Sequence, residues 1–307
     1  QLLNVHTGTW DEDILDAIGV PKDMFKELIK PGTVIGPLTE QLQEVTGLGP
    51  VPVVAPGTHD TASAVAAVPA EGTNWAYISS GTWSLMGIEA DRPVSTEKAF
   101  GYNFTNEGGV FGTIRFLKNI MGLWLVQRCR AAFDKEIDYG TLTQMAADAP
   151  AFVSLIDPDR DEFMNPASMT EAIDEFCTKT GQPTPASEGA YIRCCLESLA
   201  FQYRRVLEML SDVYETSFEK INIVGGGTQN KLLNQFTADA TGTTVVTGPI
   251  EATIIGNIIM QAIGMGHIKD IAEGRKIIRN SFEMETFTPA NKSDWDDHYE
   301  RFLAMKK

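Results

Sequence analysis

Apolar and polar positions alternate between helix-like and strand-like periods along most of the chain. In residues 10–29 the pattern predicts two short helices, broken at Gly19–Pro21, with acidic residues in the first turn. A short helix is predicted at Thr39–Thr46, and the apolar run Val51–Ala55 predicts a short buried strand. The small residues Thr61–Ala67 then predict a tightly packed helix. This alternation of strand and helix is typical of an α/β protein.

A second and longer alternation begins near Gly72. Its predicted elements are a strand pair within residues 74–90, a strand within 110–116, a long helix over 117–133, a helix over 192–210, a strand–turn–helix–strand unit over 220–248 and a helix over 251–266. Polar and proline-rich residues 134–188 predict turns and short helices. We therefore expect the end of one α/β domain in residues 1–72 and a fuller α/β domain in residues 73–307.

Composition and charge narrow the range of partners. The 307 residues include 43% hydrophobic and 21% charged side chains, which is ordinary for a globular protein. The formal net charge of −16 argues against a nucleic acid or an anionic membrane as partner, because both attract basic surfaces. It does not exclude a nucleotide, since backbone amides at helix starts can hold phosphates. No apolar run approaches the roughly 18 residues of a membrane span.

The four cysteines show no spacing that is typical of a metal site, and the sequence predicts no metal ligands. Their simplest interpretation is buried, reduced thiols of an intracellular protein. They are Cys129, Cys177, Cys194 and Cys195.

Asp60 lies at a strand-to-helix turn, between the predicted strand Val51–Ala55 and the small-residue helix. One interpretation is a helix N-cap, because an aspartate oxygen can accept from the free amides of the first turn. The other is a general base that faces a cleft, where small neighbouring side chains allow a ligand or a second domain to approach. The local sequence leaves both interpretations open.

Two glycine-containing turns could hold a nucleotide. The turn Ser79–Thr82 offers hydroxyls and backbone amides that could wrap phosphate oxygens, although a plain hairpin would use the same residues. Gly225–Gly227 separates a predicted strand from a helix, where a flat backbone could contact a ligand or simply connect the two elements. Gly225 and Gly227 fit the first glycines of the dinucleotide fingerprint, but Asn230 occupies its third position.

The segment Asp138–Thr143 resembles the phosphate loop of actin-like ATPases, but its context does not fit. That loop follows a buried apolar strand, whereas polar residues 134–136 precede this one. A helix start capped by Asp138 fits better.

Four segments in this order and spacing resemble sugar kinases of the FGGY family, across essentially the whole chain. They are "GTHDTASAV", "YISSGTWSLMGIE", "TNEGGVFGTIRFLKNIMGLWLVQ" and "IVGGGTQNKLLNQFTADATG". Each is weak alone, and the combination is specific. The third segment, with the Trp-Ser that follows Gly81-Thr82, favours the L-rhamnulokinase subgroup.

This resemblance implies an actin-like, ribonuclease H-like ATPase fold, with the end of domain I and a complete domain II, and with ATP and sugar bound in the cleft between the two domains. It implies a cytoplasmic enzyme that transfers the γ-phosphoryl group of ATP, with Mg²⁺, to O1 of L-rhamnulose. Another ketose such as L-fuculose or L-xylulose, a non-catalytic sugar- or nucleotide-binding module, and an actin-like scaffold are the alternatives. A retained Asp60 favours the enzyme.

Carried over residue by residue, the resemblance assigns roles on the sugar side and on the ATP side. Asp60 resembles the catalytic base, and His59, Thr61 and Asn119 resemble further sugar contacts. The residues that resemble ATP contacts are Gly81, Thr82, Gln127, Gly225, Gly226, Gly227 and Asn230. Asn119 and Gln127 are expected on one helix, roughly 12 Å apart on the same side.

One departure from the family is that its first phosphate loop, an Asp-x-Gly hairpin, does not occur in these 307 residues. We therefore expect an incomplete nucleotide site and no kinase activity from this chain alone. The family can also carry disulfides, which makes Cys177 and Cys194 a candidate pair. The sequence does not indicate the oligomeric state.

Overall fold

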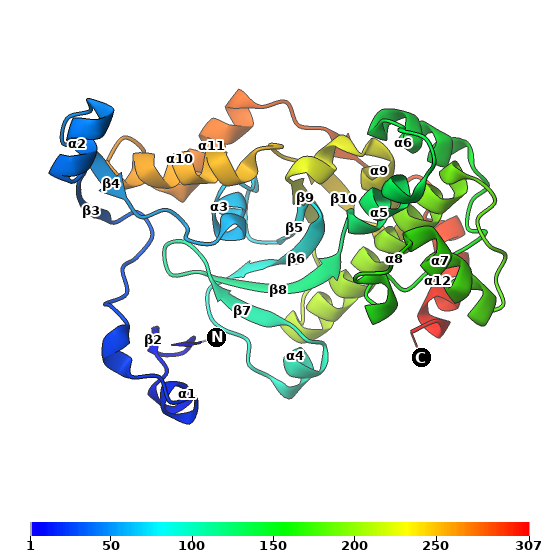
Figure 1. Cartoon of the computed structure of the whole chain (residues 1–307), viewed down its shortest axis with the longest axis horizontal. Coiled ribbons are helices and arrows are strands. Elements are labelled where there is room, and N and C mark those ends of the chain that lie inside the picture. The colour runs from blue at the N-terminus through cyan, green and yellow to red at the C-terminus, as the bar shows by residue number, and fades with distance from the viewer. Residues whose placement is uncertain (1, 307) are drawn as a thin grey trace. The chain divides into compact units, whose positions relative to one another are not determined.

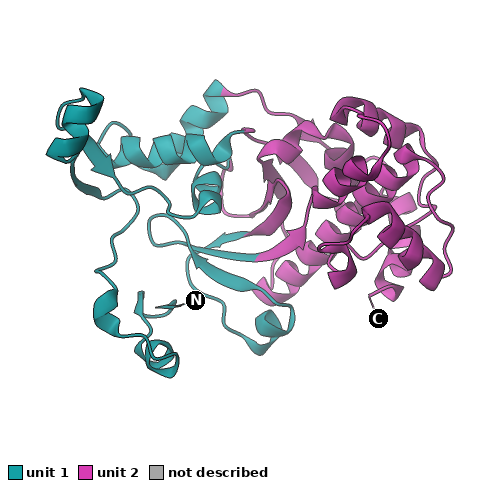
Figure 2. Cartoon of the chain, in the orientation of Figure 1, with its two compact units in different colours: residues 1–69, 88–117, 251–281 teal, residues 70–87, 118–250, 282–307 magenta. Residues whose placement is uncertain are grey.

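The computed structural model describes residues 2–306 as two compact units, each built from separate stretches of sequence (Figure 2). Unit 1 contains residues 1–69, 88–117 and 251–281, and unit 2 contains residues 70–87, 118–250 and 282–307. The first change of unit, after Pro69, lies near the boundary expected at Gly72. Because both units are discontinuous, two consecutive domains remain a prediction.

Unit 1 is built from short strands and helices. Its strands are β1 (Leu3–Asn4), β2 (Thr9–Trp10), β3 (Val34–Pro37), β4 (Pro52–Val54) and β7 (Thr105–Gly108). Its helices are α1 (Glu12–Ala17), η1 (Lys22–Met24), α2 (Glu40–Thr46), α3 (Asp60–Ala66), α4 (Glu97–Gly101), α10 (Ala252–Gly264) and α11 (Ile271–Ser281). The predicted strand at Val51–Ala55 is present as β4, but its burial was predicted wrongly, because Pro52 and Val53 are exposed. The second predicted short helix is only the 3₁₀ turn η1.

The small residues of α3 serve its close packing against α10, beside which it lies (Figure 1). All six residues from Thr61 to Ala66 are buried. A Cβ atom at Gly256 of α10 would lie only 1.8 Å from the carbonyl oxygen of Ser63. Since real Cβ contacts do not come so near, glycine at 256 is required for this approach of the two helices.

Unit 2 contains the long helix that the apolar spacing predicted, now α8 (Glu188–Tyr214), together with the helices packed on it. Its other helices are α5 (Trp124–Ala132), α6 (Tyr139–Asp148), η2 (Asp161–Phe163), α7 (Met169–Lys179), η3 (Gly226–Gln229), α9 (Lys231–Thr241) and α12 (Lys292–Ala304). Its strands are β5 (Trp75–Ser80), β9 (Lys220–Val224), β10 (Thr244–Thr247) and β11 (Thr286–Phe287). Strands β6 (Trp83–Ala90) and β8 (Ile114–Met121) contribute residues to both units.

The largest sheet has the strand order β11-β10-β9-β5-β6-β8-β7. β9 pairs in parallel with both β5 and β10, whereas the pairs β10–β11, β5–β6 and β7–β8 are antiparallel. Every residue of β5 except Ser79 is buried, as expected of a central strand whose two faces are both covered. The turns that follow β5 and β9, which are neighbours in parallel, therefore emerge at the same edge of the sheet.

Candidate functional site

Asp60 is the first residue of α3, and the N-cap position belongs to His59, whose side chain makes no capping hydrogen bond. Oδ1 of Asp60 accepts from the amide of Thr61 at 2.7 Å. The carboxylate thus satisfies one amide of the first turn, but from inside the helix rather than from the N-cap position of the first interpretation. Its side chain is 74% exposed. Within the described part of the chain, Oδ2 has no hydrogen-bond partner, so this atom can accept a proton from a bound hydroxyl.

His59, a predicted sugar contact, lies directly against Asp60. Its Nε2 atom is 3.0 Å from Oδ1 of Asp60, and half of the imidazole is exposed. Thr61, the third residue of this set, is buried. Thr61 therefore supports the carboxylate through its amide, while His59 and Asp60 form the accessible part of the site in unit 1.

Glu107 and Arg115, which the sequence analysis did not single out, also contact His59. Oε2 of Glu107 is 3.4 Å from Nδ1 of the imidazole. The Nη2 atom of Arg115 is 3.4 Å from the same Nδ1. A partial signal was available in the sequence: a glutamate and an arginine lie at symmetric positions on either side of the glycine-rich turn Gly109–Thr113, which indicates their pairing across a hairpin but not their contact with His59.

On unit 2, the turn between β5 and β6 is fixed by backbone hydrogen bonds to the start of α5. The amides of Leu123 and Trp124 donate to the carbonyl oxygens of Gly81 (3.1 Å) and Thr82 (3.0 Å). These first amides of α5 are therefore used by the turn itself and not by a ligand. The Oγ1 atom of Thr82 lies 3.4 Å from the side-chain amide of Gln127, and Thr82 is exposed. The structure thus brings together three of the predicted ATP contacts: Gly81, Thr82 and Gln127.

In the glycine-rich turn, two glycines are required by close packing and the third has open space around it. Gly225 has φ +91°, and a Cβ there would lie 2.7 Å from the carbonyl oxygen of Ser80. A Cβ at Gly227 would lie 1.9 Å from Oγ of Ser80, whereas one at Gly226 would meet nothing within 4 Å. Asn230 caps α9, since its Oδ1 accepts from the amide of Leu233 at 2.9 Å. Of these three glycines, Gly226 alone is exposed, and it begins the 3₁₀ turn η3.

Asn119 does not share a helix with Gln127, and this prediction was wrong. Asn119 lies on strand β8, whereas Gln127 lies on helix α5, so the expected 12 Å spacing along one helix does not apply. The apolar residues Leu117, Ile120 and Met121 are buried and have helical spacing, but they lie on a strand. The Asn119 side chain is exposed.

A group of buried charges lies beside Asn119 in unit 2. Asp159 accepts from the amide of Met121 at 2.9 Å and from Gln202 at 2.5 Å. Burial raises the pKa of Asp159, and burial also lowers the pKa of Lys118, which Asp159 and Asp157 partly offset. These contacts fix the end of β8 and hence the backbone that carries Asn119.

The cysteines and the Asp138 turn are structural. All four cysteines are free, buried thiols, so Cys177 and Cys194 form no disulfide in this structure. Burial raises the pKa of Cys177 to about 11, which leaves it as an unreactive thiol. Oδ1 of Asp138 accepts from the amide of Thr141 at 3.0 Å at the start of α6, which confirms the capped helix start.

No group of three or more His, Cys, Asp and Glu in residues 2–306 could hold a metal ion. Across those same residues, none of the helices is both long and apolar enough to pass through a membrane.

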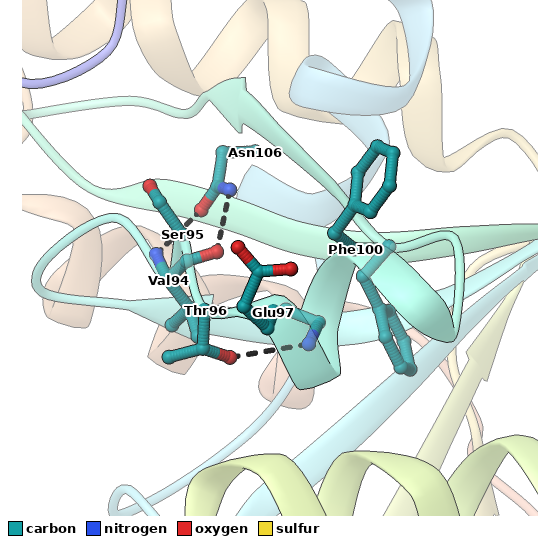
Figure 3. A pocket seen from close by; sticks show the side chains of 8 residues that line it. Val94, Ser95, Thr96, Glu97, Phe100 and Asn106 are labelled. Carbon is teal, nitrogen blue, oxygen red and sulfur yellow. Dashed lines mark hydrogen bonds between the residues drawn. The ribbon is translucent and has the colours of Figure 1, made fainter.

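A pocket beside α4 in unit 1 contains none of the predicted site residues (Figure 3). The amide group of Asn106 bonds to the backbone of Val94 in both directions, at 2.8 and 2.9 Å. Thr96 caps α4 through the amide of Ala99 at 3.1 Å. Because these side chains are held by internal hydrogen bonds, the pocket does not compete with Asp60 as the candidate site.

Comparisons with known proteins identify the family of the chain. Residues 76–265 match the C-terminal domain of the FGGY family of carbohydrate kinases. Residues 1–67 match the N-terminal domain of the same family. The chain belongs to the FGGY family of carbohydrate kinases.

Its curated relatives include several rhamnulokinases. The rhamnulokinase of Bacteroides thetaiotaomicron is 49% identical over 302 residues, which cover 98% of this chain and 62% of the relative. That of Pectobacterium atrosepticum is 44% identical over 307 residues, covering 100% of this chain and 61% of the relative. The chain thus spans about three fifths of the length of these relatives.

Solved structures confirm the predicted fold class, an actin-like ATPase fold. A xylulose kinase from Rhodospirillum rubrum matches with a TM-score of 0.75 at 18% identity, over 99% of this chain and 61% of that chain. A glycerol kinase from Plasmodium falciparum, solved with ADP, matches with a TM-score of 0.68 at 17% identity, over 98% of this chain and 61% of that chain.

Proposed function

We propose that this chain carries the catalytic base and the nucleotide-binding turns of an ATP-dependent kinase that phosphorylates L-rhamnulose at O1. The observation that carries the proposal is the Asp60 carboxylate, which is exposed, bonded through Oδ1 alone and placed beside His59. The identity of 41–49% to rhamnulokinases across 94–100% of the chain supports this sugar over other ketoses. A cytoplasmic location is part of the same proposal.

The proposed base acts on the attacking hydroxyl. Oδ2 of Asp60 accepts the proton of the O1 hydroxyl as the oxygen forms its bond to the γ-phosphorus of ATP. The bond between that phosphorus and the β–γ bridging oxygen breaks, and ADP leaves with the electron pair. Oδ1 keeps its contacts with His59 and Thr61 throughout, so the carboxylate does not rotate during the transfer. We assign Asn119 to a further sugar hydroxyl, and His59, whose two ring nitrogens face protein groups, to the edge of the sugar site.

On the nucleotide side, we assign Thr82 and Gln127 to polar contacts with ATP and the exposed backbone of Gly226 to the adenosine. The open space over Gly226 supports this assignment, because no protein atom would meet a Cβ there within 4 Å. Gly81, Gly225, Gly227 and Asn230 act indirectly, by shaping the two turns.

Magnesium is proposed as the counter-ion of the ATP phosphates, where it neutralises the developing charge. The described residues offer no cluster of three metal-ligating side chains. Mg²⁺ is commonly held by one or two carboxylates together with substrate phosphates, so the nucleotide itself supplies ligands.

The test is a panel of L-rhamnulose, L-fuculose, L-xylulose, D-xylulose and glycerol, with MgATP and a coupled assay for ADP. The protein that carries these residues, whatever its full length, is compared with its Asp60→Asn variant. We expect the highest kcat/KM with L-rhamnulose and a phosphomonoester at C1 of the product by NMR. A higher kcat/KM with another ketose would reassign the substrate, and no sugar-dependent ADP release would favour a binding module. The 307 residues alone, assayed in parallel, test the expectation that they are inactive.

A further inference from the structure

We propose that Glu107 and Arg115 are positioning residues that hold His59 in the orientation in which it supports the catalytic carboxylate. This inference rests on the proposed function, because it adds two groups to the machinery around Asp60. It concerns unit 1 alone, in which all four side chains lie.

The pair is set by the register of a hairpin. Strands β7 and β8 run antiparallel, and Glu107 lies directly opposite Arg115. Nη2 of Arg115 is 2.9 Å from Oε2 of Glu107, and its Nε donates to the carbonyl oxygen of Gly108 at 3.2 Å. The guanidinium is therefore fixed at two edges by groups of one hairpin.

The same two groups meet on one atom of the imidazole. Nδ1 of His59 lies 3.4 Å from Oε2 of Glu107 and 3.4 Å from Nη2 of Arg115. On the other side of the ring, Nε2 is 3.0 Å from Oδ1 of Asp60. With Nε2–H donating to Asp60, Nδ1 is an acceptor and takes its hydrogen bond from Nη2 of Arg115, while Glu107 acts through Arg115 by holding that guanidinium. Rotation of the ring is thus opposed at both nitrogens. A histidine that is half exposed would otherwise sample several rotamers.

Arg115 is held at a cost to stability. Its side chain is only 2% exposed, and its buried Nη1 atom has no hydrogen-bond partner in residues 2–306. Leaving such a donor unpaired costs free energy, more so for a charged group. A hairpin whose only requirement was stability could carry an apolar pair at these positions without that cost.

The consequence for catalysis follows from the geometry. While His59 occupies Oδ1, the unpaired Oδ2 remains the oxygen that receives the proton. If Glu107 or Arg115 is lost, the imidazole can turn away, and the carboxylate can rotate between its two oxygens. Turnover should then fall, whereas ATP binding should not change, because the predicted ATP contacts lie on other elements.

A purely structural cross-strand ion pair is the competing explanation, and the chain supplies a matched control. Arg275 and Glu89 form another buried pair in unit 1, with Nη2 and Oε2 2.9 Å apart and side chains 10% and 12% exposed. Arg275 contacts the carbonyl oxygen of Val65 on α3, but neither residue contacts His59. Glu89→Gln therefore reproduces the loss of a buried charge without touching the imidazole.

The experiment compares Glu107→Gln, Arg115→Lys, Arg115→Met and Glu89→Gln in the protein that carries these residues. We expect Glu107→Gln and Arg115→Met to lower kcat by about 10-fold to 100-fold, the range typical of groups that orient a directly acting residue. The KM for ATP should stay within about twofold, and Arg115→Lys should recover part of kcat by restoring the charge. Glu89→Gln should lower the melting temperature by about as much as Glu107→Gln does, but it should leave kcat unchanged.

A double-variant test shows whether the pair acts through His59. In a His59→Ala background, Glu107→Gln should cause no further loss of kcat, since the group that it orients is gone. Equal effects of Glu107→Gln and Glu89→Gln on kcat, or additive effects of His59→Ala and Glu107→Gln, would overturn the inference. An active wild type with an unaffected Glu107→Gln variant would refute the inference alone. A wild type that phosphorylates no sugar would refute the proposed function, and the inference with it.

Discussion

A Cβ atom at Gly227 would lie 1.9 Å from Oγ of Ser80, the last residue of β5. The turn after β9 therefore packs directly on the end of the neighbouring strand, and glycine is required at this position. One residue earlier, at Gly226, a Cβ would meet nothing within 4 Å. Two adjacent glycines thus have different roles, which a pair of substitutions can separate.

We predict that Gly226→Val raises the KM for ATP at least about tenfold, since a branched side chain would occupy the space assigned to the adenosine. The KM for the sugar should change little and the melting temperature should not fall, because Gly226 lies outside the left-handed region and has open space around it. Gly227→Ala is the control for packing. Gly227→Ala should lower the melting temperature, and it should not raise the KM for one substrate more than the KM for the other. Equal increases in both KM values for Gly226→Val would point to a structural role for the whole turn.

Asp60→Asn should lower kcat by about 10² to 10⁴, the range for loss of a general base. Asparagine keeps the size of the side chain and its hydrogen bond to the amide of Thr61, so the start of α3 should stay intact. The affinity for sugar and ATP, measured by calorimetry, should therefore stay near that of the wild type. Asp138→Asn is a suitable control, because Asp138 only caps α6, and its kcat should match the wild type. Near-normal turnover of the Asp60→Asn variant would leave only a structural role for Asp60.

Gln127→Ala should raise the KM for ATP by about 2-fold to 10-fold, the value of one neutral hydrogen bond. The contact of its amide group with Thr82 is long, at 3.4 Å, so the group is available to a ligand at little cost to the fold. Arg128→Ala is the neighbouring control, because Arg128 donates to the carbonyl oxygen of Pro166 at 3.0 Å and contacts no predicted ATP residue. The control should leave both KM values unchanged. A change in KM for the sugar alone with Gln127→Ala would move Gln127 to the sugar side.

The longest periodic segments were predictable from the sequence, and the ambiguous apolar ones were not. α8 spans 27 residues, far longer than a strand, and its apolar positions keep helical spacing, so periodicity identifies it as a helix. In residues 117–121 the apolar side chains are Leu117, Ile120 and Met121, whose helical spacing continues into α5, so periodicity predicts a helix where the structure has a strand. The break between them is Gly122, where a Cβ would lie 2.7 Å from the amide nitrogen of Ser84.

The residues of the candidate site also fall into two groups: those that the sequence indicates and those that only tertiary structure brings together. Asp60 and the two glycine-containing turns stand out locally, because their residue types match a known family in order and spacing. Glu107 and Arg115 meet His59 only through the register of a hairpin, 56 positions from His59 in the case of Arg115. The pairing of Glu107 with Arg115 is local to the hairpin, but their contact with His59 is a property of tertiary structure that no local pattern indicates. The different roles of Gly226 and Gly227 likewise depend on Ser80, which is remote in sequence.

Glu197 makes the stability of unit 2 depend on pH. Its side chain is 1% exposed on α8, where it accepts from Nε of Arg193 at 2.6 Å and from the amide of Phe152 at 2.9 Å. Burial raises the pKa of Glu197 from 4.5 to about 7, and the attraction of Arg193 offsets only part of that effect. An acid whose pKa is raised on folding stabilises the fold below its unfolded pKa, and that contribution is lost as the pH rises through the folded pKa.

We therefore predict that the contribution of Glu197 is complete below pH 4.5 and is lost between pH 4.5 and about 7. Urea unfolding of the wild type and of Glu197→Gln from pH 4 to pH 8 measures it. The difference in free energy of unfolding, wild type minus variant, should fall by about 3 kcal/mol across this window and then stay constant, since one pKa unit corresponds to about 1.4 kcal/mol. Subtracting the variant removes the titration of every other carboxylate, and Arg193 stays charged throughout. A difference that stays the same from pH 4 to pH 8 would show that the ion pair, rather than burial, sets the pKa of Glu197.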